Sequence, residues 1–174
     1  MDSKGQAFSV FQLLIAAVVA GAILVILFQV LDRIIDPVGQ DPNKIAGEVV
    51  QTQVTNTGVP AYRDVTFGRD GALSASSIAN QTNSISASRI CIAVSDDVPN
   101  ADEFTVGDTG KALQYSGGNQ QARLMVFCER GNEIEDALGA FSYDFDIPSI
   151  SGACSSDFTS SSSKSCFVAV VPGI

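Results

Sequence analysis

The longest hydrophobic stretch of the chain lies near the amino terminus, in the segment Gln6–Asp36. Its central part, Leu13–Phe28, contains no polar side chain. Because an α-helix rises about 1.5 Å per residue, the segment would form a helix roughly 45 Å long, enough to cross the ~30 Å apolar slab of a bilayer. Asp32 and Arg33 then bring charges onto the helix near its end. The pattern therefore predicts a long hydrophobic assembly or transmembrane helix over this segment.

Three kinds of segment share this pattern. The first is a cleaved secretory signal, and Ala20-Gly21-Ala22 contains a small-x-small cleavage pattern. An ordinary signal, however, has an apolar region of about 7–15 residues that ends before the cleavage site, whereas Ile23–Phe28 continue the run beyond it. The second is an uncleaved single-pass anchor, which fits the length equally well. The third depends on the residues that precede the apolar run.

The apolar run follows a very short polar leader, Met-Asp-Ser-Lys-Gly, and begins at Gln6 without a break. A leader that ends in Lys4-Gly5 resembles the class III signal peptide of archaeal type IV pilin-like proteins. Ser9 and Phe11 are similar to residues of the euryarchaeal pattern, and Val10 stands where the family usually has glutamate. The resemblance covers the N-terminal part of the 174 residues and does not extend to the rest of the chain.

The resemblance implies a leader of residues 1–5 and a cut between Gly5 and Gln6 by a prepilin peptidase on the cytoplasmic side of the membrane. The helix of residues 6–36 would then be retained in the cytoplasmic membrane and would become the core of a helical homopolymer, built by the pilus assembly machinery. The implied location of the assembled subunit is the cell surface, in an extracellular filament.

Small residues within the apolar run also favour assembly. Apolar burial between helices contributes little in lipid, so close association depends on small residues that let two backbones approach. Ala16 with Ala20, and Ala17 with Gly21, form two overlapping small-xxx-small pairs. Because alanine and glycine are common in any membrane helix, these pairs give mild support to helix packing.

Residues 37–58 are predicted to form a kinked stalk that continues into an amphipathic helix. Pro37 and Pro42 would each disrupt or end a continuous helix. Asp41-Pro42 is also a helix start signal, with Asp as the cap and Pro at the first helical position. The stripe of this helix stops at Asn56-Thr57-Gly58, and one face is expected to pack on the external domain. The stripe consists of Ile45, Ala46, Val49, Val50, Gln53 and Val54.

Residues 59–174 show short β-like runs separated by turn residues such as Gly68-Arg69-Asp70-Gly71, which predicts a sheet-rich extracellular head domain. No helices alternate with these runs, so we expect an antiparallel rather than a parallel sheet. Residues 72–88 are rich in Ser, Ala and Asn and are expected to be exposed and partly irregular. The predicted strands are 62–67, 89–95, 103–106, 112–116, 123–129, 141–147 and 167–171.

The predicted fold class is therefore α+β. A long N-terminal hydrophobic helix with a kinked stalk would precede a mainly antiparallel β-sheet or β-sandwich head domain. At 174 residues the chain has room for the helix and one domain of about 120 residues, enough to bury a core.

Charge excludes one class of partner. The net charge is −9 and the pI is near 4.2, so the basic footprint that nucleic-acid binding needs is absent. Lys4 before the apolar run, with Asp36, Asp41 and Glu48 after it, agrees with a cytoplasmic amino terminus. The domain is then expected outside the cell.

The four cysteines all fall in the part predicted to be external, where an even number favours two disulfides. Cys154 and Cys166 bracket a serine-rich loop, and we expect them to pair. Cys91 and Cys128 lie in strand-like runs and are expected to tie two strands together. A four-thiolate zinc site is the rival, but zinc ligands usually come in close pairs such as C-x2-C, and no such pair occurs here.

One modification site is predicted. Asn80-Gln81-Thr82 is the only N-glycosylation sequon of the chain, and it lies in the polar stretch of residues 72–88. Such tripeptides arise often by chance. For an external surface protein we nevertheless expect Asn80 to carry a glycan.

Catalytic chemistry is not expected. The chain has no histidine, which removes the usual general base. Ser161–Lys164 formally matches the S-x-x-K nucleophile motif but lies in a serine run without companion motifs. Gly110-Lys111 fails the phosphate-loop spacing. Candidate calcium ligands match no EF-hand loop, and solvated acidic turns are the simpler explanation. These candidates are Asp96, Asp97, Asp102, Glu103, Asp144 and Asp146.

The sequence as a whole predicts a structural protein without cofactor, metal or enzymatic activity. We expect a type IV pilus-like filament subunit that polymerises through its N-terminal hydrophobic helix and displays a β-rich head for surface adhesion. The alternative is a monomeric extracytoplasmic binding module held in the membrane by an uncleaved helix. A secreted hydrolase released by signal cleavage is disfavoured by the missing histidine.

Overall fold

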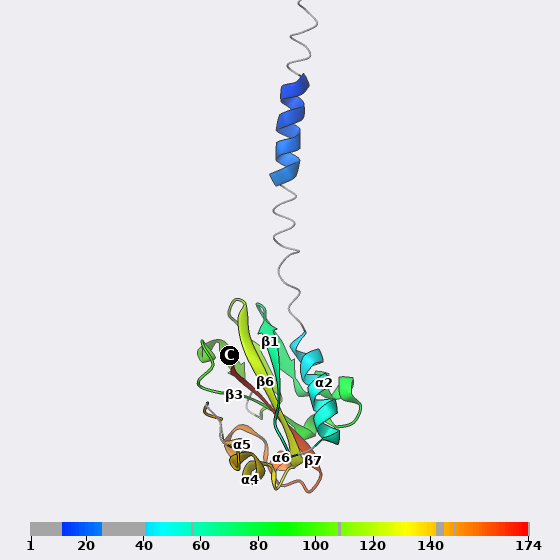
Figure 1. The fold of residues 1–174 in the computed structure, drawn as a ribbon, viewed down its shortest axis with the longest axis vertical. Coiled ribbons are helices and arrows are strands. Elements are labelled where there is room, and N and C mark those ends of the chain that lie inside the picture. The colour runs from blue at the N-terminus through cyan, green and yellow to red at the C-terminus, as the bar shows by residue number, and fades with distance from the viewer. Residues whose placement is uncertain are drawn as a thin grey trace, which may run out of the picture. The chain divides into compact units, whose positions relative to one another are not determined.

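The computed structural model of the chain describes residues 12–25, 41–56, 58–107, 109–141, 145–147 and 149–173. The chain divides into two compact units, Met1–Val38 and Gly39–Ile174. We call the described helix of the first unit, residues 12–25, the apolar helix, and we call Gly39–Ile174 the globular unit. Figure 1 shows the apolar helix in blue and the elements of the globular unit from cyan to red.

The apolar helix is too short for the role predicted from the sequence. It has fourteen described residues, which at about 1.5 Å per residue span roughly 21 Å, less than the ~30 Å apolar slab of a bilayer. None of the helices in the described ranges combines the length and apolar character that a membrane crossing needs. The prediction of a long, membrane-spanning N-terminal helix is therefore wrong for the part of the chain that the structure describes.

Helix α2 (Pro42–Thr55) belongs to the globular unit and not to a stalk, so the predicted kinked stalk is also wrong. Its start is as expected, with the Asp41 side chain accepting a hydrogen bond from the Asn43 amide at 3.0 Å. The helix lies within the globular unit because one of its faces is buried against β1 and β6. Its buried residues are Ala46, Gly47, Val49, Val50 and Gln53, which confirms most of the predicted stripe.

The main sheet has four strands in the order β1-β6-β7-β3. Their bounds are Ala61–Phe67 for β1, Gln120–Arg130 for β6, Lys164–Pro172 for β7 and Ile90–Val94 for β3. β6 pairs antiparallel with both β1 and β7, whereas β3 pairs parallel with β7.

The sheet is therefore mixed: two of its three pairings are antiparallel, as expected, and the parallel pairing of β3 with β7 departs from the prediction. The parallel pair joins strands far apart in the sequence, with three further strands, β6 among them, and four short helices between them in the described part of the chain. The long connection that a parallel pair needs is thus built from further strands and helices. A connection of this kind leaves no pattern of alternating strands and helices in the sequence.

A second, smaller sheet contains β2 (Ala72–Ser74), β5 (Ala112–Tyr115) and β4 (Phe104–Val106), all antiparallel. An aromatic cluster connects it to the main sheet. The ring of Phe104 lies 5.2 Å from that of Phe67 and 4.5 Å from that of Tyr115, measured between centroids. The contact places the small sheet in the same core as the main sheet.

Short helices complete the globular unit. They are α3 (Ala75–Thr82), η1 (Ala87–Arg89), η2 (Ala101–Glu103), α4 (Ile134–Gly139), α5 (Ile150–Ala153) and α6 (Ser156–Thr159). The expectation that residues 72–88 are exposed and partly irregular is wrong as to exposure in part, because α3 buries Ala75 and Ile78. The strand predicted over 141–147 is absent from its described residues, where Phe141, Phe145 and Ile147 pack on a core instead of joining a sheet.

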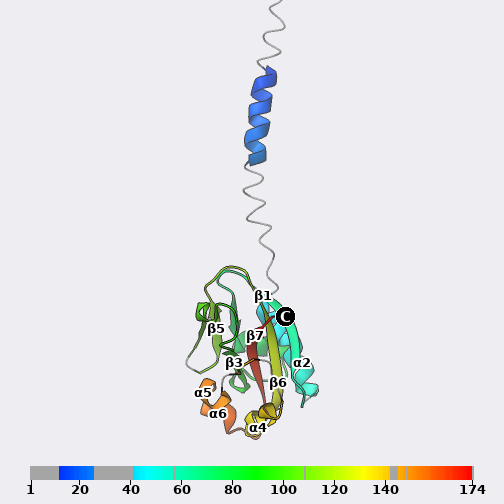
Figure 2. The same cartoon turned by 60° about the vertical axis from the view of Figure 1, so that its left-hand side comes forward.

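The main sheet is covered on both faces, as Figures 1 and 2 show. Side chains of β7 alternate between two cores, with Val168 and Val170 in one and Phe167 and Ala169 in the other. The first core lies under α2, α3 and the small sheet, and the second includes residues of α4, α5 and α6. Burial on both faces explains why β7 reads as a continuous apolar run, Phe167–Val171.

Candidate functional site

The apolar helix presents its side chains to its surroundings on every side. All of residues 12–25 are exposed, including Ala16, Ala17, Ala20 and Gly21, which the sequence predicted as packing residues. A Cβ atom built on Gly21 would meet nothing within 4 Å, so the space beside this glycine is open. The packing role of the four small residues remains a prediction. The predicted cleavage site at Gly5 and Gln6 lies outside the described residues.

The four cysteines form two disulfides, as expected, but the predicted pairing is wrong. Cys91 pairs with Cys154, and Cys128 pairs with Cys166. β7 lies between β3 and β6 in the sheet, so Cys91 and Cys128 are on strands that are not neighbours. Cys128 instead has Cys166 directly opposite in the β6–β7 ladder.

The two disulfides lie on opposite faces of the main sheet. Cys128 and Cys166 belong to the core under α2, whereas Cys91 and Cys154 belong to the core that includes α4, α5 and α6. The predicted loop closure between Cys154 and Cys166 therefore fails, even though the two residues are close in sequence. The Cys91–Cys154 disulfide fastens the α5–α6 segment to β3.

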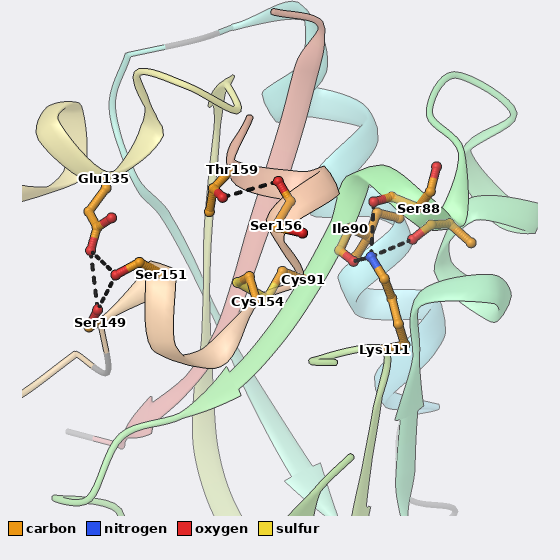
Figure 3. The surroundings of a disulfide bond; sticks show 11 residues. Ser88, Ile90, Cys91, Lys111, Glu135, Ser149, Ser151, Cys154, Ser156 and Thr159 are labelled. Atoms are coloured by element: carbon orange, nitrogen blue, oxygen red, sulfur yellow. Dashed lines mark hydrogen bonds between the residues drawn. A yellow bond between two sulfur atoms is a disulfide. The ribbon is translucent and has the colours of Figure 1, made fainter. Parts of the chain in front are cut away.

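Lys111 forms hydrogen bonds with the backbone beside the Cys91–Cys154 disulfide, as Figure 3 shows. Its Nζ atom donates to the carbonyl oxygens of Ala87 at 3.3 Å, Ser88 at 2.9 Å and Ile90 at 2.8 Å. All three acceptors lie where η1 leads into β3. The three donors of the ammonium therefore fix the path of the chain at this point.

The electrostatic surroundings of Lys111 combine opposing effects. Burial lowers the pKa of the Lys111 ammonium, the carboxylate of Asp157 raises it, and the guanidinium of Arg89 lowers it again. The Phe158 ring also lies below the ammonium, with its centroid 6.0 Å from Nζ. Lys111 thus lies among charged groups from η1 and α6 as well as among backbone carbonyls.

Gly110, the residue before Lys111, allows close packing against the disulfide. Its φ is +62°, and a Cβ atom there would lie 2.6 Å from Cys91 Sγ and 2.8 Å from the Ala153 carbonyl oxygen. Its own carbonyl accepts from the Ile92 amide at 2.7 Å. A side chain at this position would separate the segment from β3, and the left-handed backbone also favours glycine.

Glu135 connects α4 to α5 on the other side of the disulfide (Figure 3). Its Oε1 atom accepts from the hydroxyls of Ser149 and Ser151, each at 3.2 Å, and the two hydroxyls lie 2.8 Å apart. These contacts hold the start of α5 close to α4. The result is a polar connection at the surface of the second core.

Asn80, the predicted glycosylation site, is exposed on α3. Thr82 of the same sequon is 4% exposed, and its hydroxyl donates to the Ala79 carbonyl at 3.1 Å. The asparagine is thus accessible, whereas the threonine faces the core. Glycosylation of Asn80 stays a prediction.

Among the residues that the structure describes, the catalytic and metal candidates from the sequence are not assembled into sites; the candidate Asp144 lies outside these residues. Lys164 Nζ donates to the Val54 carbonyl at 2.5 Å, and the Ser161 hydroxyl accepts from the Ser163 amide at 3.0 Å, so the S-x-x-K residues have separate partners. Asp97 Oδ2 accepts from the Asp146 amide at 2.6 Å. Within the described ranges, no three His, Cys, Asp or Glu side chains come together to hold a metal ion.

Comparison with known proteins gives no relative for the chain: no family model, no curated protein and no solved structure matches it.

The roles of Lys111 and Arg89 are not predicted by the sequence. In the sequence, Lys111 belongs to a Gly-Lys pair that fails the phosphate-loop spacing, and Arg89 is the first residue of a predicted strand. Neither residue belongs to a local motif, because their surroundings come from η1, α6 and the loop before β5. The available signal in the sequence was the cation Arg89 at the start of the predicted strand that carries Cys91. A cation at that position does not indicate which residues it contacts.

Proposed function

We propose that the chain is a structural subunit of an extracellular filament, assembled through its apolar helix and carrying the globular unit for surface adhesion. The resemblance of Lys4-Gly5-Gln6 and the following apolar run to the start of archaeal type IV pilin-like proteins supports this proposal. The proposal does not require that the helix crosses a membrane.

Exposure of the apolar helix is the observation that carries the proposal. Its eight large apolar side chains are between 48% and 70% exposed. Fully burying one such side chain contributes about 1.5–3 kcal/mol, so the helix has a strong drive to associate. These side chains are Leu13, Leu14, Ile15, Val18, Val19, Ile23, Leu24 and Val25.

The distribution of these side chains favours several partners over one. A helix turns by about 100° per residue, so Val18 points about 140° away from both Leu13 and Ile23, which are themselves about 80° apart. A single partner helix covers one stripe and would leave the other directions exposed. Burial from several sides is what a bundle of identical helices in a filament core provides.

Features of the globular unit agree with an extracellular location. Two disulfides form and persist in oxidising environments, which include secreted and cell-surface proteins. The net charge of −9 keeps an exposed protein soluble.

Sedimentation of the full chain without detergent tests this function. The wild-type chain should form large polymers, and Val18→Lys should prevent them because a charge would enter the helix bundle. Val59→Lys is the matched control, since Val59 is 64% exposed in the globular unit. This variant should assemble like the wild type. A wild-type chain that stays monomeric, or a Val18→Lys variant that polymerises normally, would contradict the proposal.

A further inference from the structure

A polar pocket of about 380 Å³ lies beside η1 and α6 in the globular unit. Five residues line it, namely Ser88, Arg89, Asp157, Ser160 and Ser161. The lining thus contains three serines, one cation and one carboxylate, and no apolar side chain. The volume lies within the range of about 300–1,000 Å³ that is usual for small-molecule sites.

Arg89 is the unusual residue of this pocket. Its Nη1 atom is buried and has no hydrogen-bond partner among the described residues. A buried charged donor without an acceptor is unfavourable, because the hydrogen bonds it would make to water are not replaced. Asp157 lines the same pocket, but within the described part of the chain it forms no ion pair with Arg89 at 4.0 Å or less. Among the described residues, the guanidinium therefore has no carboxylate partner.

The local charge is positive although the chain as a whole is acidic. Arg89 and the nearby Lys111 contribute two positive charges, and Asp157 contributes one negative charge. Lys111 directs its hydrogen bonds to the carbonyls of Ala87, Ser88 and Ile90, so its ammonium supplies charge without needing a ligand. Arg89 is therefore the cation in this region that still needs a hydrogen-bond acceptor.

The serine hydroxyls of the pocket and the Asp157 carboxylate indicate the chemistry of the other groups of the ligand. Ser161 Oγ accepts from the Ser163 amide, which leaves its own hydroxyl proton free to donate. Asp157 is an acceptor for donors such as sugar hydroxyls, and its charge disfavours ligands with two negative charges, such as phosphate. A carboxylate matches the planar guanidinium and carries a single charge.

From this arrangement we propose that the pocket binds a monoanionic carboxylate that also carries hydroxyl groups, the chemistry of a uronic-acid sugar. Arg89 would receive the carboxylate, and Asp157 with the serines would bind the hydroxyls. The site would give the globular unit a preference for acidic polysaccharide surfaces. It does not depend on filament assembly.

Titration calorimetry on the full chain, in a detergent without sugar groups, tests the proposal with three probes: glucuronate, glucose and inorganic phosphate. Glucuronate should bind at least about tenfold more tightly than glucose, which lacks the carboxylate and so forms no charged pair with Arg89. Phosphate should bind more weakly than glucuronate. Equal binding of glucuronate and glucose, or stronger binding of phosphate, would overturn the assignment.

Two variants and a matched control connect binding to the pocket. Arg89→Gln should remove the preference for glucuronate over glucose, whereas Arg63→Gln, which removes the same charge from an exposed position on β1, should retain it. Asp157→Asn, at an exposed position, should increase phosphate binding. An unchanged preference in Arg89→Gln, or unchanged phosphate binding in Asp157→Asn, would refute the roles assigned to these residues. Melting temperatures verify that each variant is folded.

Discussion

Cys166 of β7 lies directly opposite Cys128 of β6, with the two Cα atoms 4.1 Å apart, and the disulfide between them crosses neighbouring antiparallel strands. The next residue, Phe167, points to the opposite face and lies opposite Phe127 on one side and Cys91 on the other. Cys166 and Phe167 are therefore adjacent in β7 but point to opposite faces of the sheet, and each face carries one of the two disulfides. The sheet register determines the pairing of the cysteines, which sequence separation alone does not reveal.

The first prediction concerns this pairing. Peptide mapping under non-reducing conditions should recover Cys91 linked to Cys154 and Cys128 linked to Cys166. In the chain-entropy model, loops of 63 and 38 residues each contribute about 4 kcal/mol, so replacing either pair with alanine should lower the free energy of unfolding by roughly that amount. Recovery of a Cys154–Cys166 peptide would contradict the register.

Lys111 provides the second prediction. Lys111→Met should lower the free energy of unfolding by about 2–4 kcal/mol, because three carbonyl oxygens lose a charged donor. Lys44→Met is the control at an exposed position of α2, and it should change the stability by less than about 0.5 kcal/mol. Urea denaturation measures both variants. Equal effects in the two would show that the Lys111 contacts do not stabilise the fold.

The third prediction is a pH dependence that comes from Tyr115. Burial raises the pKa of its hydroxyl above the ordinary value of 10.0, and a hydrogen bond to Glu103 and the charge of Glu103 raise it further. Below pH 10 the folded and unfolded states both hold the proton, so the contribution to stability is constant. Above pH 10 the unfolded state releases its proton first, and stability falls as the pH rises through the folded-state pKa.

Comparison of the wild type with Tyr115→Phe between pH 8 and 11 measures this contribution. The decrease in unfolding free energy above pH 10 should be smaller in the variant, since phenylalanine does not titrate. The same decrease in both proteins would show that the tyrosine pKa is not raised by the fold.

Local patterns in the sequence predicted much of the globular unit. The Asp41-Pro42 cap fixed the start of α2, and apolar runs located six of the seven strands, since both signals depend on neighbouring residues. The three-residue strand β2 is too short to give such a signal. The parallel partnership of β3 with β7 depends on distant segments, and so it could not be predicted.

The N-terminal segment and the pocket show two further limits. Apolar composition predicted one membrane-spanning helix over residues 6–36, whereas the described helix covers residues 12–25 and is not long enough to span a membrane. Residues of η1 and α6, which are far apart in the sequence, line the same pocket. Arg89 and Asp157 therefore do not form a sequence motif from which the pocket could be predicted.

Electron microscopy of the purified full chain under oxidising conditions, without detergent, tests the proposed filament most directly. The account predicts filaments whose three-dimensional reconstruction shows the helices of residues 12–25 packed together in the core, with the globular units outside. A reconstruction in which the globular units alone form the contacts, or a preparation of monomers without filaments, would contradict it.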